Sequence, residues 1–293
     1  MASGRERIAA ALGTEIEPLE RLAGGCIADV VATTTRHHGP IVAKLAGSDG
    51  TLDVEAGMLR DLAVRAPFLP NPEIYYADAG LLIMERLPGS TGIGIDAQPH
   101  LAELLAELHG VTAPKFGYPR DTLIGSLPQP NAAGSRPGCW ADFFAEHRVR
   151  AFATRARTRG SISEAGLRTA HALADAIRSS PERYVAPGED PVLIHGDLWS
   201  GNMLSDGGRV TGLIDPAIYF ADREIELAFV TLFGCVGDAF FGRYGELRPI
   251  QPGFWEFRRD LYTIYPLLVH ATLFGGGYGA QAEAAMARVL GRA

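Results

Sequence analysis

The chain has 293 residues, of which 47% are hydrophobic and 21% are charged, and its formal net charge at pH 7 is −7. This composition is typical of a globular protein with room for two lobes, and the negative charge argues against a basic nucleic-acid-binding surface. No apolar run reaches membrane-spanning length and the amino terminus has no apolar signal core, so we expect a cytoplasmic protein that does not bind membranes. Three widely spaced cysteines exclude a disulfide framework and a zinc site.

The amino-terminal residues predict a helix followed by a small sheet. A helix is expected over residues 3–12, then two strands separated by the Gly24-Gly25 turn, and a third strand over 41–45. A glycine turn between strands lets backbone N–H groups approach phosphates, so Gly24 and Gly25 are candidate nucleotide-binding residues. Lys44 lies in the apolar third strand, where a charge needs a partner. Its position fits the lysine that holds nucleotide phosphates in kinase small lobes.

The next helix supplies the expected partner of Lys44. Apolar residues recur at helical spacing over residues 51–64, and Pro67 closes the pattern. Glu55 lies one turn before Leu59 in the apolar stripe, so we prefer it to Asp53 as the residue that pairs with Lys44.

A hairpin over residues 74–87 turns at Ala79-Gly80 and precedes a break at Pro88-Gly89-Ser90. We place the lobe boundary there, with an ATP-binding lobe over 1–88 and a catalytic and substrate-binding lobe over 89–293. Backbone groups of Glu85 and Leu87 are expected at the adenine edge, and Met84 is expected to line the purine pocket or to belong to the core.

The second lobe is predicted to be mainly helical, with helices over 96–109, 140–155, 163–178, from 222 onward and over 254–274. Asp222 is positioned to cap the fourth of these. Residues 116–131 are expected to form a long functional loop, because their length and turn chemistry exceed those of a linker.

The segment over residues 191–217 predicts a catalytic loop. A short apolar strand ends at His195-Gly196-Asp197, Asn202 follows, and a second strand ends at Asp215. We expect Asp197, Asn202 and Asp215 to converge at the mouth of one hairpin. Phosphoryl transfer uses one carboxylate to accept a proton, and an amide oxygen with a second carboxylate to hold Mg²⁺. Each of these residues alone is typical of a turn, but together they indicate a kinase.

Residues 193–202, Leu-Ile-His-Gly-Asp-Leu-Trp-Ser-Gly-Asn, resemble the signature of the fructosamine kinase family, which is related to aminoglycoside phosphotransferases. Similar segments extend along most of the chain, including 116–131 and 222–234. The resemblance implies an α+β, bilobal protein-kinase-like fold and ATP- and Mg²⁺-dependent phosphorylation of a sugar hydroxyl on a ketosamine, after which the product loses its sugar. By that resemblance Asp197 is the general base, Asn202 and Asp215 bind Mg²⁺, Lys44 holds ATP and is oriented by Glu55, and Trp199 lines the sugar site.

Alternatives remain open from the sequence. The acceptor is a protein-bound or free ketosamine, or another hydroxyl compound such as an aminoglycoside, choline or a sugar, and a non-catalytic nucleotide-binding pseudokinase is a third reading. A monomer and a homodimer are both compatible with the sequence. Asp29 and the 219–221 stretch depart from the family pattern near the phosphates and before Asp222-Arg223. Cys26, in the glycine turn, is hypothesised to be a redox switch.

Overall fold

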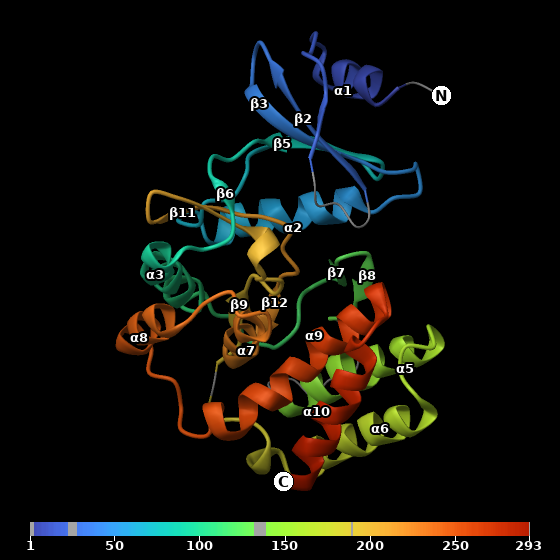
Figure 1. Cartoon of the computed structure of the whole chain (residues 1–293), viewed down its shortest axis with the longest axis vertical. Helices are drawn as coiled ribbons and strands as arrows, with labels where there is room; N and C mark the ends of the chain where they lie inside the picture. Colours follow the sequence, from blue (N-terminus) through green and yellow to red (C-terminus); the bar gives the residue numbers. More distant parts are fainter. Residues whose placement is uncertain (1–2, 23–27, 132–138, 189, 293) are drawn as a thin grey trace.

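The computed structural model describes residues 3–22, 28–131, 139–188 and 190–292, and its chain folds into two lobes (Figure 1). Gly24, Gly25 and Cys26, on which three of the predictions fall, lie outside the described residues. Among the described residues, no helix is long and apolar enough to cross a membrane.

The smaller lobe is a sheet with a helix on each face. Its strands follow the order β1-β2-β3-β5-β4 and are antiparallel to their neighbours. Its described elements are α1 (Gly4–Leu12), β1 (Glu20–Arg21), β2 (Asp29–Thr35), β3 (Gly39–Leu45), α2 (Leu52–Arg65), β4 (Ile74–Ala77) and β5 (Leu81–Glu85).

Alternation along β3 divides the apolar residues of this lobe between the two faces. Ile41 and Ala43 pack with α1 on one face. Val42 packs on the opposite face, in the cluster that contains the α2 residues Leu52, Ala56 and Leu59. Lys44 has the same parity as Val42, so its side chain is directed toward α2.

The larger lobe is mainly helical and contains three small sheets among the described residues. They are β11-β10-β6, β12-β9 and β7-β8. Its elements are β6 (Ser90–Thr91), α3 (Gln98–Leu108), β7 (Thr122–Ile124), β8 (Leu127–Gln129), α4 (Trp140–Phe143), a π-helical turn (Phe144–Arg150), α5 (Ala151–Thr158), α6 (Glu164–Ser179), β9 (Val192–Ile194), β10 (Met203–Asp206), β11 (Arg209–Leu213), β12 (Tyr219–Ala221), α7 (Glu224–Leu232), α8 (Asp238–Leu247), a second π-helical turn (Phe254–Arg258), α9 (Arg259–Phe274) and α10 (Tyr278–Arg292).

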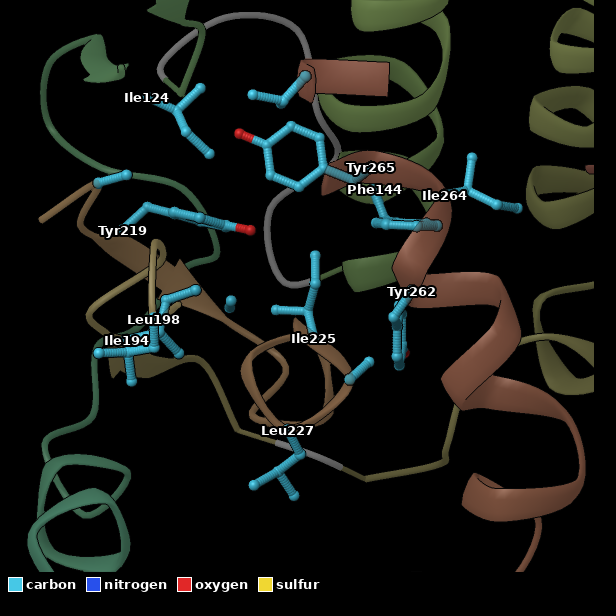
Figure 2. Packing of buried hydrophobic residues seen from close by; sticks show 14 of the residues in the cluster. Ile124, Phe144, Ile194, Leu198, Tyr219, Ile225, Leu227, Tyr262, Ile264 and Tyr265 are labelled. Atoms are coloured by element: carbon cyan, nitrogen blue, oxygen red, sulfur yellow. The ribbon is translucent and has the colours of Figure 1, made fainter. Parts of the chain in front are cut away.

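One continuous apolar core fills this lobe. In Figure 2, Ile194, Leu198 and Tyr219 lie on one side of the cluster, and Tyr262 and Tyr265 of α9 on the other. The β9–β12 strand pair and helix α7 therefore belong to the same core as α9, and β9 leads directly into the turn that carries Asp197.

The predicted hairpin is present: β10 and β11 form it, Asn202 precedes β10 and Asp215 follows β11. The strand before His195 lies outside this hairpin, because β9 pairs with β12, the buried strand over residues 219–221.

Residues 116–131 do not form a plain loop, because β7 and β8 make a short hairpin within them. Its strands have three residues each, and Pro128 lies in the second, so neither gives a strong sequence signal. Asp222, the expected cap of α7, lies one residue before the N-cap residue Arg223, and its carboxylate accepts a hydrogen bond of 2.9 Å from the N–H of Glu224, the first residue of the helix.

Candidate active site

A buried lysine joins two carboxylates from different parts of the chain. Lys44 Nζ lies 2.7 Å from Glu55 Oε1 on α2 and 2.6 Å from Asp215 Oδ1 beyond β11. Burial lowers the pKa of Lys44, but the carboxylates of Asp215 and Glu55 outweigh it, and the net pKa is raised. The lysine is therefore a permanent cation, and Glu55 rather than Asp53 is its partner, as the sequence predicted.

Asp215 has a backbone conformation that is rare for its residue type. Its φ angle is 55°, which makes it the only described residue other than glycine with positive φ. The Ile214 N–H just before it donates to the Asn202 backbone carbonyl at 3.0 Å. This bond holds the residue before Asp215 against the segment that carries Asn202, and the strained conformation directs the carboxylate toward Lys44.

Asp197 and Asn202 form the second part of the site. Asn202 Nδ2 donates to the backbone carbonyl of Asp197 at 2.8 Å and to its Oδ2 at 3.0 Å. Burial, with the nearby Asp215 carboxylate, raises the pKa of Asp197 from 3.8 to about 7. A carboxylate with this pKa is suited to accept a proton near neutral pH.

A buried glutamate that no sequence motif indicates supports the turn before Asp197. Glu226 Oε1 accepts from the Gly196 N–H at 2.7 Å, and its Oε2 lies 3.0 Å from His109 Nε2. The other ring nitrogen of His109 lies 2.7 Å from the hydroxyl of Tyr244. Gly196 has a φ of 84°, and a Cβ there would overlap the Ala217 carbonyl, so this turn requires glycine.

Trp199 lies on the surface of the catalytic loop. The residue is 41% exposed, so it is not part of the apolar core. Its six-membered ring covers Gly201, where an added Cβ would overlap the ring. An exposed indole fixed between Asp197 and Asn202 is a suitable surface for stacking against a bound molecule.

The three residues predicted around the adenine lie at the end of β5 and beyond it. Met84 is buried in the α2-side cluster of the smaller lobe. The Glu85 N–H donates to the Glu73 carbonyl at 2.8 Å, so the carbonyl is the backbone group that Glu85 can offer a ligand. A Cβ at Gly212 of β11 would lie 2.8 Å from Leu87 Cδ1, which places Leu87 against the larger lobe.

The donor set fits a hard cation shared with a phosphate ligand. In the described part of the chain, no group of three or more His, Cys, Asp or Glu residues could hold a metal alone. Asn202 and Asp215 supply two oxygen-bearing side chains, and Mg²⁺ commonly takes one or two protein ligands and completes its shell with phosphates and water. Asp29, the anion expected near the phosphates, pairs with Arg21 at 2.6 Å on the surface.

Comparison with known proteins gives consistent matches over nearly the whole chain. The sequence model of the fructosamine kinase family matches residues 3–292. A probable ketoamine kinase of Synechocystis is 36% identical over 231 residues, covering 76% of this chain and 72% of its own. The chloroplastic protein-ribulosamine 3-kinase of Arabidopsis thaliana is 32% identical, covering 92% of this chain and 81% of its own.

Solved structures agree with these sequence matches. A candidate fructosamine-3-kinase from Thermobifida fusca superposes with a TM-score of 0.84 at 29% identity, covering 99% of each chain. A mutant of the aminoglycoside phosphotransferase APH(4)-Ia, in ternary complex with ADP and hygromycin B, has a TM-score of 0.65 at 17% identity and supports the fold alone. The chain therefore adopts the protein-kinase-like fold, and it belongs to the fructosamine kinase family.

Proposed function

We propose that this protein is an ATP- and Mg²⁺-dependent kinase that phosphorylates a sugar hydroxyl of ketosamines, of the fructosamine or ribulosamine 3-kinase type. The observation that carries the proposal is Asp197. It is a half-buried carboxylate with a pKa of about 7, and it is hydrogen-bonded to Asn202 on the loop that also carries Trp199. The names of the relatives, ketoamine kinase and protein-ribulosamine 3-kinase, supply the acceptor class.

Asp197 is the proposed general base. It would take the proton of the acceptor hydroxyl as the oxygen attacks the terminal phosphorus of ATP, and the phosphorus–oxygen bond to ADP breaks. The side chain of Asn202 orients the carboxylate, since its Nδ2 donates to Asp197 Oδ2. Because the carboxylate is unprotonated only above a pH of about 7, proton transfer would be most efficient at neutral to mildly alkaline pH.

The nucleotide is proposed to bind between the two lobes, whose boundary we place at residue 88. Lys44, oriented by Glu55, would hold its phosphates, and the Gly24-Gly25 turn would cover them. Asn202 and Asp215 would hold Mg²⁺, which neutralises phosphate charge during transfer. The adenine would lie against Met84 and the backbone of Glu85 and Leu87.

Trp199 is proposed to line the sugar site. Its indole is exposed beside the base, and stacking of a ring on a sugar face would orient the hydroxyl toward Asp197. Lys44, Asp197, Asn202 and Asp215 are all present and spatially close, which argues against the pseudokinase alternative.

The test is a panel of acceptors offered with MgATP: fructoselysine, ribuloselysine, free fructose, choline, an aminoglycoside and unmodified lysine. We expect ADP release with the two ketosamines, and phosphorus NMR should locate the phosphate on the sugar. The Asp197→Asn protein is the background control. Turnover of the aminoglycoside, choline or fructose with none of the ketosamines would replace the proposed acceptor, and nucleotide binding without turnover of any compound would favour the pseudokinase.

A further inference from the structure

Residues 117–131, here called the bridging segment, have polar contacts that the proposed function does not use. The segment starts beside helix α2, passes through the β7–β8 hairpin and ends near the carbonyl groups that follow Asp215. Figure 1 shows β7 and β8 near the junction of the two lobes, on the side where α9 ends.

The first end of the bridging segment is bonded to α2. The Tyr118 hydroxyl donates to Asp61 Oδ2 at 2.8 Å, and Arg120 Nη2 donates to the same oxygen at 2.5 Å. The guanidinium of Arg65, one turn further along α2, lies 5.9 Å from the centre of the Tyr118 ring and 5.6 Å from that of Phe220. Cation–π contacts at such distances add to the attachment.

Packing agrees with these polar contacts. Leu52, Ala56 and Leu59 of α2 belong to a cluster of the smaller lobe. Met58 and Leu62, on another face of the same helix, belong to the continuous core of the larger lobe. Helix α2 is therefore divided between the lobes, and its carboxyl-terminal half is fixed to the larger one.

The second end of the bridging segment is bonded to the chain after Asp215. Gln129 Nε2 donates to the Ala217 carbonyl at 3.0 Å and to Thr122 Oγ1 at 2.8 Å. The Thr122 hydroxyl donates to the Ile218 carbonyl at 3.3 Å. Both side chains are buried, and the Ala217 N–H donates to the His195 carbonyl at 2.8 Å, so this peptide is held on both sides.

We propose that the bridging segment fixes the positions of Glu55 and Asp215 relative to each other, so that both carboxylates meet Lys44 in the geometry that binds MgATP. Arg120, Thr122 and Gln129 are its positioning residues, and Asp61 is their contact on α2. Glu55 is on α2 and Asp215 is on the loop before Ala217, and the bridging segment is bonded to both elements. The inference rests on the proposed function, because it assigns these residues to the nucleotide site of that kinase.

Helix geometry supports an effect over this distance. Asp61 lies six residues after Glu55, about 9 Å along the helix axis at 1.5 Å per residue. With a lever of this length, a tilt of α2 by about 17° at Asp61 would displace Glu55 by as much as its 2.7 Å contact with Lys44. Loss of the attachment should weaken nucleotide binding without removing any group that touches the nucleotide.

The α2 end is tested with Arg120→Gln and Asp61→Asn, by calorimetric measurement of MgATP affinity and by hydrogen exchange of the α2 amides. We expect the dissociation constant to rise about fivefold, the lower range of coupling between sites, and exchange over residues 52–65 to accelerate. The charge-reversed pair Asp61→Arg with Arg120→Asp should restore part of the MgATP affinity and part of the protection of the α2 amides from exchange. Arg157→Gln breaks an ion pair with Glu164 in the larger lobe, whose arginine is about as exposed as Arg120, and should change neither the affinity nor the exchange.

The Asp215 end is tested with Thr122→Val, which removes the hydroxyl at nearly constant volume, and Thr122→Ser, which keeps it. We expect Thr122→Val to raise the Mg²⁺ concentration needed for half-maximal nucleotide binding about tenfold, as for loss of a group that orients a metal ligand. Thr122→Ser should behave as wild type. Should Thr122→Val not fold, Gln129→Met tests the same end, because it removes the donor to Ala217.

Affinity and exchange equal to those of Arg157→Gln in both α2-end variants would overturn the proposal, as would an unchanged Mg²⁺ requirement at the Asp215 end. These readouts need no acceptor, so a failure of ketosamine phosphorylation leaves them informative. A wild-type protein that does not bind MgATP would contradict the proposed function, while exchange of α2 in the variants would still decide whether the bridging segment holds the helix.

Discussion

The two sides of the site rest on different kinds of support. Lys44 belongs to a sheet whose apolar residues are divided into two small clusters, one with α1 and one with α2. Asp197 follows a strand in the continuous core of the larger lobe, and buried Glu226 bonds the turn before it. Lys44 is thus held mainly by ion pairs to Glu55 on α2 and to Asp215 after β11, whereas Asp197 is held by packing and by backbone hydrogen bonds.

This difference has an energetic consequence. Ion pairs with limited exposure are stable only while both partners are present, because an unpaired buried charge is costly. A continuous apolar core distributes its stability over many contacts, so one polar substitution on its surface changes chemistry more than folding. Variants on the two sides should therefore differ: those near Asp197 should lose activity without losing stability, and those near Lys44 should lose both.

The largest expected effect is on catalysis at Asp197. Asp197→Asn removes the proton acceptor and keeps the shape, so kcat should fall at least about 100-fold while KM for ATP changes little. Steady-state kinetics measures kcat and KM for ATP, and urea unfolding of the same preparation measures the free energy of unfolding. Asp206→Asn, at the exposed end of β10, is the control. A kcat near that of wild type would remove Asp197 from the role of base.

The next effect concerns the ion pairs of the smaller lobe. Lys44→Met leaves Glu55, whose side chain is 16% exposed, without its cation. We expect loss of MgATP binding and a decrease of about 3 kcal/mol in the free energy of unfolding. Adding Glu55→Leu should recover stability but not binding. Arg86→Gln breaks a more exposed pair with Glu20 in the same region and should cost less than about 1 kcal/mol. Equal costs for the two single variants would contradict the contrast.

The pH dependence separates chemistry from stability within the larger lobe. With a pKa of about 7, Asp197 is protonated below that pH, and kcat/KM should fall about tenfold per pH unit there. The raised pKa means that the folded protein binds a proton which the unfolded chain loses near pH 3.8. That stabilisation is complete below about pH 3.8 and is lost as the pH rises through about 7.

Asp197→Asn removes this titration. Its stability advantage over wild type should therefore be larger at pH 8 than at pH 5, as measured by urea unfolding at both values. A constant difference across this range would mean that Asp197 titrates with an ordinary pKa. The kinetic limb below pH 7 should then be absent as well.

The smallest effect is expected at Trp199. Trp199→Ala should raise KM for a fructosamine about three- to tenfold, which corresponds to loss of one aromatic contact, and leave KM for ATP unchanged. Stability should change little because the side chain is 41% exposed. Trp255→Ala, which removes a similarly exposed indole from the second π-helical turn, is the control. Equal increases in both KM values with a lower Tm would assign Trp199 a structural role.

Local chemistry made part of the site predictable. Lys44 in an apolar strand required a partner, and the helix that follows it offered Glu55. The contact of Glu226 with Gly196 was not predictable in this way, because 30 residues separate them and no periodicity marks the pair. The same applies to Asp61, which sequence alone presents as one more charged helix residue.

The fold shows the same limits. Long periodic segments such as α6 appeared at nearly the predicted positions, with Ser163 as the N-cap. The pairing of β9 with β12 was missed, because three-residue strands carry too little alternation to specify a partner. The β7–β8 hairpin is not predictable from the sequence for the same reason, because each of its strands has three residues.

The ring of Trp199 over Gly201 makes two positions behave as one. Gly201 is not among the positive-φ glycines, so the restriction there concerns space rather than backbone angle. Any side chain at 201 would displace the indole, and tolerance at 201 should return once Trp199 is replaced by a small residue. Among natural relatives the two positions should therefore vary together. A library that randomises the acceptor site should vary the two positions jointly, since a side chain at 201 and the indole in its present place exclude each other.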